Sequence, residues 1–322
     1  MSRNHGRAPA APRKAMMAAG RVLALLVLAA AAGPTAMAQP GPEPTSAPTQ
    51  TGPMLLDRMP PAVYEALAAS RSRQVAIRDL RWRTPTVRVA FNGGSEALYA
   101  LIEATAQEWT QGGRLQLSFK DASGRYRKWS ENDTRPSADI RIGFFTDPDR
   151  DGYWSSVGVM ARDLRADEAT MNYGGFVALL GPNYPRPDSP TWRASYSRSA
   201  VLHEFGHALG LAHEHFHPKC QADLKLDEAI ASLVRSQGWS SVTAQYNLDA
   251  AFYFREMARR TTAPASYTPA TDRSSVMMYS FPDSFYRSAS QSPCKPASPG
   301  GHATALSPGD RQFYLANYSR IP

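Results

Sequence analysis

Three histidines and one glutamate stand at spacings that can build a metal centre, in the segment VLHEFGHALGLAHEH from Val201 to His215. His203 and His207 are four residues apart, so on a helix their rings lie on one face about one turn apart. Two imidazoles placed in this way can bind one metal ion at about 2.1 Å. Glu204 lies about 100° around the helix from His203, so it stands near the metal without having to ligate it.

The residues that follow this helix supply the rest of the site. Gly210 stands where the chain must leave the helix, and glycine tolerates the left-handed conformation that a sharp exit needs. That exit returns His213 to the metal as a third ligand. Three imidazoles leave a fourth position open for water, which is the catalytic and not the structural pattern of zinc. We therefore predict one catalytic Zn²⁺ ion on His203, His207 and His213, in preference to a helix with solvated surface histidines.

Two short motifs carry a resemblance to a known superfamily. The string HEFGHALGLAH, which begins at His203, matches the H-E-x-x-H-x-x-G-x-x-H pattern of the metzincin metallopeptidases. These enzymes also have a methionine turn beneath the metal, and residues 275–279, SVMMY, resemble that turn with Met277 as its methionine. Glu214 and His215 follow the third histidine as in the astacins, whereas serralysins have a proline there and carry glycine-rich calcium repeats that this chain lacks. The chain therefore resembles an astacin-like metzincin.

The resemblance implies a fold, an activity and roles for individual residues. The implied fold is α+β, in which a mixed twisted sheet with helices precedes a more irregular C-terminal subdomain. The implied activity is that of a zinc endopeptidase, in which Glu204 acts as the general base that takes a proton from the attacking water and passes it to the leaving amine. Tyr279 would be a distant fifth zinc ligand that swings to stabilise the transition state. Met277, Glu214 and Gly210 would support the site.

The chain also departs from the astacin pattern. Astacins usually have four cysteines in the catalytic domain and this chain has two, and neither the astacin pro-segment aspartate motif nor the matrixin cysteine switch is present. Two other functions stay open: a zinc-binding protein that binds a partner without cutting it, and a protease dedicated to one substrate or to its own processing. Glu204 argues against the first, because binding zinc does not require that residue.

The carboxylate after the third histidine has two interpretations. In astacins this acid reaches the new N-terminus that proteolytic processing creates, and Glu214 occupies that position here. Such processing would cut this chain between Met54 and Trp82. The competing hypothesis is that Glu214 pairs with a nearby arginine or backbone amide and that no second cut occurs.

Apolar periodicity predicts the elements that must hold this site. A helix from Ser95 to Trp109 connects the first two of three alternating segments, and that order predicts a parallel strand pair with a right-handed crossover. Residues Met171–Leu180 predict an edge strand with a glycine kink, and a substrate could extend along 171–176 because an unpaired edge accepts a peptide backbone. The predicted strands are 87–91, 115–119 and 140–144, and the further helices are 195–209, 226–237, 242–248 and 308–318.

Weaker signals have structural alternatives. The aspartates of 147–151 resemble the start of a calcium loop, but Gly158 stands where an EF-hand needs glutamate, so a polar hairpin turn is favoured. His215 and His217 follow three complete ligands, so we expect them beside the site or on the surface. Aromatic residues after the methionine turn could line a specificity pocket or pack in the core, and these are Phe281, Phe285 and Tyr286.

The N-terminus predicts an export signal. Residues 1–21 carry five basic and no acidic residues, an apolar run of 11 residues spans Val22–Ala32, and Ala36-Met37-Ala38 is an A-x-A cleavage signal. A membrane anchor is the alternative, but it needs about 20 apolar residues. The predicted organisation is a signal peptide at 1–38, a proline-rich linker or pro-segment at 39–80, and a catalytic domain at 81–322 with subdomains 81–213 and 214–322.

Export changes what the composition implies. The 322-residue chain has a formal charge of +8, and removing residues 1–38 takes away five basic and no acidic residues, which leaves +3. So mild a charge argues against a nucleic-acid partner. We expect a secreted or periplasmic monomer that acts on protein or peptide and has no stable membrane association after signal cleavage. An oxidising compartment lets Cys220 and Cys294 pair, and two buried thiols are the alternative.

Overall fold

The computed structural model describes residues 80–181, 183–258, 268–298 and 300–321. These residues belong to one compact unit of the chain, Gln50–Pro322. The predicted signal peptide and the linker or pro-segment up to residue 79 lie outside the described residues, so both stay predictions. Within the described part of the chain, no helix is long and apolar enough to cross a membrane.

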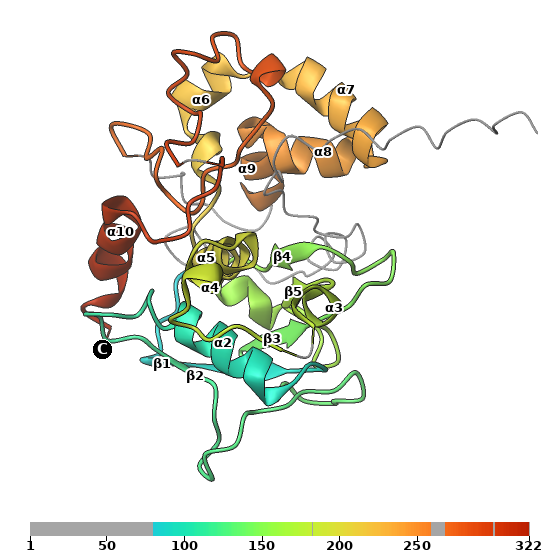
Figure 1. Ribbon diagram of the computed structural model, residues 1–322, viewed down its shortest axis with the longest axis vertical. Coiled ribbons are helices and arrows are strands. Elements are labelled where there is room, and N and C mark those ends of the chain that lie inside the picture. The colour runs from blue at the N-terminus through green and yellow to red at the C-terminus, as the bar shows by residue number, and fades with distance from the viewer. Residues whose placement is uncertain (1–79, 182, 259–267, 299, 322) are drawn as a thin grey trace, which may run out of the picture. The chain divides into compact units, whose positions relative to one another are not determined.

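One mixed sheet lies beneath α5 (Tyr196–Ala208), the helix that contains His203 and His207 (Figure 1). Its strands run in the order β2-β1-β3-β5-β4. The pairs β1–β2, β1–β3 and β3–β5 are parallel, and β4 runs antiparallel to β5. The predicted parallel pair with a helical crossover is therefore confirmed, with α2 between β1 and β2. The strands are β1 (Thr86–Phe91), β2 (Gln116–Ser118), β3 (Ile140–Gly143), β4 (Tyr153–Ser155) and β5 (Met171–Tyr173).

Helices divide between the sheet half and the half that follows it. In Figure 1, α6 to α9 gather on the side of α5 that lies away from the sheet. The sheet half contains α2 (Glu96–Ala106), α3 (Phe176–Leu180), α4 (Pro190–Arg193), α5 (Tyr196–Ala208) and the 3₁₀ turn η2 (Gly158–Arg162). The second half contains η3 (Glu214–Phe216), α6 (Pro218–Asp223), α7 (Leu226–Gln237), α8 (Ser241–Leu248), α9 (Ala250–Ala258), η4 (Asp283–Phe285) and α10 (Pro308–Tyr318).

The prediction that residues 171–180 form an edge strand is wrong. β5 ends at Tyr173 and lies between β3 and β4, pairing Met171 with Ile142 on one side and Asn172 with Trp154 on the other. All three residues of β5 are buried, as in a strand covered on both faces. The glycines predicted to kink this strand instead precede a helix. Gly175 has a φ of 75° and is the N-cap of α3. β4, only three residues long, is the edge strand on this side of the sheet.

Tryptophan side chains fix the position of α5 within the sheet half. The indole N–H of Trp109 donates to the carbonyl of Leu202 at 2.9 Å, and that of Trp82 donates to the carbonyl of Ala208 at 2.7 Å. Both indoles are fully buried, and a buried N–H needs such a partner. The helix start is fixed as well, since the Ser195 side chain accepts from the amide of Arg198 at 3.1 Å.

A disulfide stabilises the second half. Cys220 at α6 is bonded to Cys294 across 74 residues of sequence, as the pairing hypothesis required. In the chain-entropy model a bridge of that span removes about 4 to 5 kcal/mol of unfolded-state freedom. The aromatic residues after the methionine turn pack around it in a buried cluster, so core packing is their main role, and these are Phe281, Phe285 and Tyr286.

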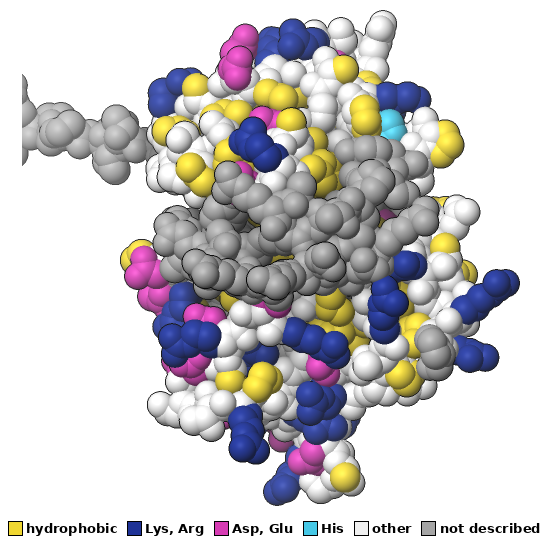
Figure 2. All heavy atoms as spheres, turned by 180° about the vertical axis from the view of Figure 1, so that it is seen from behind, with side chains coloured by type: hydrophobic (Ala, Val, Ile, Leu, Met, Phe, Trp, Pro, Cys, Tyr) yellow, Lys and Arg dark blue, Asp and Glu magenta, His cyan; other side chains and the backbone are white. Residues whose placement is uncertain are grey.

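The surface carries charges of both signs. Figure 2 shows one face on which lysines and arginines lie among aspartates and glutamates over the sheet half. Exposed ion pairs form between Arg88 and Asp139 at 3.1 Å and between Arg186 and Asp188 at 3.1 Å. Exposed pairs of this kind add little stability, so the fold depends on its buried contacts.

Candidate active site

The three predicted metal ligands meet where α5 ends. His203 and His207 project from the last two turns of the helix, and His213 comes from the segment after it. One nitrogen from each ring lies within 4.8 Å of the others, and all three side chains are buried. Nε2 of His207 lies 3.0 Å from Nε2 of His213. Among the residues with described positions, this is the only group of three or more potential metal ligands.

Backbone carbonyls determine which nitrogen of two rings faces this centre. Nδ1 of His203 lies 2.7 Å from the carbonyl oxygen of Val276, and Nδ1 of His207 lies 2.8 Å from that of Leu211. A carbonyl only accepts, so Nδ1 carries the proton in both rings and Nε2 keeps its lone pair. Neutral imidazoles in this tautomer are the form in which histidine binds zinc, so the donor set fits Zn²⁺.

Gly210 shapes the exit from α5. Its φ is 98°, a backbone conformation that favours glycine. Its amide donates to the carbonyl of His207 at 2.7 Å, and the amide of Leu211 donates to the carbonyl of Gly206 at 3.1 Å. The reversal directs the chain toward His213, and it also brings the carbonyl of Leu211 against the ring of His207.

Glu204 lies on the same helix and is fully buried. Residues 197–208 of α5 are buried on every side, so the polar face that carries the ligands is enclosed as fully as the apolar face. Burial raises the pKa of Tyr173 on β5 well above its usual range, and the charge of Glu204 raises it further. That coupling places the Glu204 carboxylate near β5.

Met277 lies under the metal-binding helix. A Cβ built on Gly206 would stand 2.3 Å from the sulfur of Met277, so the methionine fills the space that the missing side chain leaves. Gly206 lies on α5 between the ligands His203 and His207. The amide of Glu214 donates to the carbonyl of Met277 at 2.9 Å, which ties the turn to the residue after the third ligand.

Asp310 on α10 supports this turn and was missed from sequence as part of the site. Its carboxylate accepts from the hydroxyl of Ser275 at 2.7 Å and from the amide of Val276 at 3.1 Å. It also closes a capping box with Ser307 at the start of α10. Burial raises the pKa of Asp310. The sequence signal was the Ser-x-x-Asp cap, which says nothing about a second partner outside the helix.

Glu214 has a local backbone partner. Its Oε1 accepts from the amide of Asp272 at 2.8 Å, and burial raises its pKa to about 7. A carboxyl oxygen of Asp272 in turn accepts from the hydroxyl of Ser307 at 2.5 Å. This contact is of the kind required by the hypothesis that Glu214 pairs with a backbone amide. The other hypothesis needs a proteolytic cut between Met54 and Trp82, and most of those residues are not described.

Tyr279 packs against the metal ligands. Its ring centroid lies 4.2 Å from that of His213 and 5.7 Å from that of His203, and it stacks on His215 at 4.6 Å. Its hydroxyl donates to the side-chain oxygen of Asn247 at 3.3 Å. The structure thus brings the predicted tyrosine to the site and gives its hydroxyl a partner on α8.

The two further histidines of the motif region are buried. His215 lies beside the site, as one of the two alternatives predicted, with its ring centroid 5.1 Å from that of His213. Nε2 of His215 lies 2.7 Å from the carbonyl of Asn247, and Nε2 of His217 lies 2.9 Å from the carbonyl of Thr268. The amide of Lys219 also donates to Nδ1 of His217 at 3.1 Å, so backbone groups contact both nitrogens of that ring. Neither residue belongs to the group of potential metal ligands among the described positions.

The aspartate-rich segment at 147–151 forms a turn. The amides of Arg150 and Asp151 donate to the carbonyl of Asp147 at 3.0 and 2.8 Å, and the Asp147 carboxylate pairs with the Arg150 guanidinium at 2.9 Å. The geometry is that of the polar turn that the sequence favoured.

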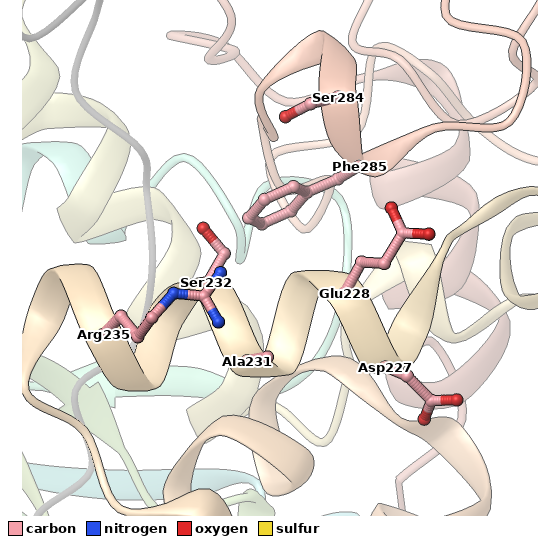
Figure 3. A pocket seen from close by; sticks show the side chains of 7 residues that line it. All are labelled: Asp227, Glu228, Ala231, Ser232, Arg235, Ser284 and Phe285. Atoms are coloured by element: carbon pink, nitrogen blue, oxygen red, sulfur yellow. The ribbon is translucent and has the colours of Figure 1, made fainter.

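A separate pocket of about 480 Å³ lies in the second half, between α7 and η4 (Figure 3). Its wall contains no residue of the histidine centre. The ring of Phe285 lies 6.1 Å from Phe281, whose ring lies 5.7 Å from Tyr279, so an aromatic layer separates the pocket from the site. The lining residues are Asp227, Glu228, Ala231, Ser232, Arg235, Ser284 and Phe285.

Comparison with solved structures finds a likeness to myroilysin, with a TM-score of 0.52 and 24% identity over 76% of this chain and 98% of that chain. The likeness is one of fold. It confirms, at that level, the α+β fold that the resemblance to an astacin-like metzincin implied.

Two other solved structures are more distant. A second structure of myroilysin gives a TM-score of 0.47 at 22% identity, over 83% of this chain and 100% of that chain. High choriolytic enzyme 1, a hatching enzyme zinc-protease from Oryzias latipes (Medaka fish), gives 0.39 at 15% identity, over 77% and 94%. No protein-family model and no curated protein match the sequence of this chain.

Proposed function

We propose that this protein is an exported zinc-dependent endopeptidase that cleaves protein or peptide substrates. The observation that carries the proposal is the centre at the end of α5, where three buried imidazoles converge beside a buried carboxylate on the same helix. A structural zinc site would need no such carboxylate. The fold shared with myroilysin is consistent with the proposal but does not carry it.

His203, His207 and His213 would hold one Zn²⁺ ion, which when bound supplies a Lewis acid that polarises the scissile carbonyl and acidifies water. Glu204 acts as the general base, which takes the proton of the attacking water and transfers it to the leaving amine. Tyr279 donates its hydroxyl proton to the oxyanion that develops in the transition state.

The substrate extends along β4 in this proposal. β4 pairs with β5 on one side, and it has no strand partner on its other side among the described residues. An extended peptide can add to such an edge through main-chain hydrogen bonds. This replaces the position at residues 171–176, which the sheet order excludes.

Export is supported by the disulfide. Cys220 and Cys294 are bonded, and disulfides persist in oxidising compartments outside the cytosol. The N-terminal signal that would direct export lies outside the described residues. N-terminal sequencing of the protein recovered from the culture medium or periplasm tests this part, with Gln39 expected as the first residue if only the signal peptide is removed.

One assay separates the proposed function from the two alternatives. Purified protein with one bound zinc is expected to degrade casein or gelatin, and a chelator should abolish that activity. A zinc-loaded protein that cuts neither substrate, but binds a partner, would instead be the non-catalytic interaction protein. Cleavage confined to its own chain or to a single protein would identify the dedicated protease.

A further inference from the structure

Asn247 is a buried polar residue that reaches the histidine centre from outside the metal motif. It lies near the C-terminal end of α8 and is 1% exposed. Burying an amide is unfavourable unless its polar atoms are hydrogen-bonded. Both polar atoms of the Asn247 side chain, and its backbone carbonyl, have partners in the structure.

These partners fix the orientation of the Asn247 side chain. Its Nδ2 donates to the carbonyl of Thr243, one turn earlier on α8, at 2.9 Å. Nδ2 has no capacity to accept, so Oδ1 is the atom that faces Tyr279, and the tyrosine hydroxyl donates to it at 3.3 Å. The backbone carbonyl of Asn247 faces Nε2 of His215 at 2.7 Å. One residue therefore contacts both rings that pack beside His213.

A phenol hydroxyl has one proton to donate. While Tyr279 donates that proton to Asn247, it cannot donate it to the oxyanion of a transition state. The contact is also long, because O–H···O bonds are usually about 2.7 to 2.8 Å and this one measures 3.3 Å. A long hydrogen bond holds the hydroxyl but is released readily.

We infer that Asn247 is a positioning residue whose side-chain oxygen holds the Tyr279 hydroxyl between turnovers and releases it when the transition state forms. The inference rests on the proposed function, because it takes Tyr279 as the donor to the oxyanion. Asn247 touches neither the substrate nor the reacting atoms, so its effect passes through the tyrosine. The contact to His215 uses the backbone of Asn247, so substitutions of the side chain test the tyrosine contact separately.

The test is a double-mutant cycle on the full zinc-loaded enzyme. N247L removes the acceptor at similar size, so kcat should rise about twofold to fivefold, the equivalent of one weak neutral hydrogen bond, with KM unchanged. In the Y279F background, where no hydroxyl remains, N247L should leave kcat unchanged. Q245L on the same helix is the matched control, since Gln245 has no described contact with the site, and it should change nothing.

A second variant keeps the inference testable if N247L does not fold. N247D places a carboxylate, which is a stronger acceptor than an amide, opposite the same hydroxyl. It should lower kcat at least twofold with Tyr279 present and leave kcat unchanged in the Y279F background. A fall in kcat for N247L, or an equal change in both backgrounds for either variant, would overturn the inference.

A measurement without catalysis separates this inference from the proposed function. In metal-free protein labelled with ¹³Cζ-tyrosine, the Tyr279 resonance, assigned by its absence from Y279F, should shift in N247L and stay in place in Q245L. An unshifted resonance in N247L overturns the inference even if the enzyme is an active peptidase. A shifted resonance in a protein without peptidase activity would leave the contact intact and remove the proposed function instead.

Discussion

In the sheet half, from residue 80 to His213, two of the three proposed metal ligands and the proposed base project from one regular helix, α5. In the half that follows, the groups that support the same centre come from helix ends and loops, through hydrogen bonds of Tyr279, Asp310 and Asn247. The first arrangement is set by the 3.6-residue period of a helix. The second depends on individual hydrogen bonds, each of which one substitution can remove.

The largest expected effect lies in the sheet half and concerns the base. E204Q should retain zinc and the fold but lose several orders of magnitude in kcat, because the amide is nearly isosteric and cannot accept the proton. Steady-state kinetics beside zinc analysis of both proteins checks this. Near-normal turnover in a zinc-loaded E204Q enzyme would remove Glu204 from the mechanism and would leave α5 as a support for the metal alone.

Removal of one proposed ligand, His207, should prevent zinc binding at the histidine centre. H207A removes the ring whose Nε2 lies 3.0 Å from that of His213, and the purified variant should contain little zinc where the wild type contains one ion per chain. Zinc binding by the wild type should also weaken as the pH falls, because the ligands must be neutral. Equal zinc in the variant and the wild type would refute the assignment of the ligands.

The tyrosine of the second half should act on rate more than on binding. Y279F should lower kcat more than it raises KM, because the hydroxyl acts on the oxyanion. The expected loss of transition-state stabilisation is about 2 to 4 kcal/mol. The ring contacts with His213 and His215 are retained, so zinc content should not change. A change confined to KM would make Tyr279 a substrate-packing residue, and the second half would then contribute no catalytic group.

Loss of the Asp310 hydrogen bonds should have a smaller effect than the substitutions above, and the effect on stability should depend on pH. D310N replaces a carboxylate that accepts from Ser275, Val276 and Ser307, so about 1 to 3 kcal/mol of stability should be lost. Denaturant unfolding measures it, and zinc affinity should fall about 10-fold to 100-fold because Val276 orients His203. An unchanged affinity would show that the turn holds its position without the Asp310 carboxylate.

The sign of the pH dependence follows from the raised pKa. A carboxyl that is easier to protonate in the folded state stabilises that state fully below the ordinary aspartate pKa of about 3.9. This contribution is lost as the pH rises through the raised pKa of Asp310. The wild type should therefore lose more stability than D310N as the pH rises from about 4. Parallel profiles would contradict this.

The smallest effect is expected for Met277. M277L conserves volume against Gly206, so the loss of stability should be under about 1.5 kcal/mol and the zinc content unchanged. Thermal unfolding of the zinc-loaded and metal-free variant checks this. A large loss of zinc would show that the sulfur has a specific role which packing does not explain.

Sequence reasoning succeeded where a regular period carries the information. The motif spacing placed His203 and His207 on one helix, α5, and the alternation of apolar residues predicted the parallel β1–β2 pair. It failed at β4 and β5, because three-residue strands have no readable period and a buried run looks alike at a sheet edge and at its centre. It could not find Asp310 or Asn247 as part of the site, because their partners lie 34 and 32 residues away in sequence.

The order in which the chain is made gives the α10 contact a further consequence. A ribosome completes His203 more than a hundred residues before it reaches Asp310, the residue whose carboxylate holds Val276 against that ring. Until then the turn that orients His203 lacks the carboxylate that holds it in place. We expect a chain that stops at residue 306 to bind zinc weakly and to lack peptidase activity, which metal titration of that fragment beside the full chain would check. Zinc binding and peptidase activity would then begin only after α10 has been synthesised, so the incomplete chain would stay inactive.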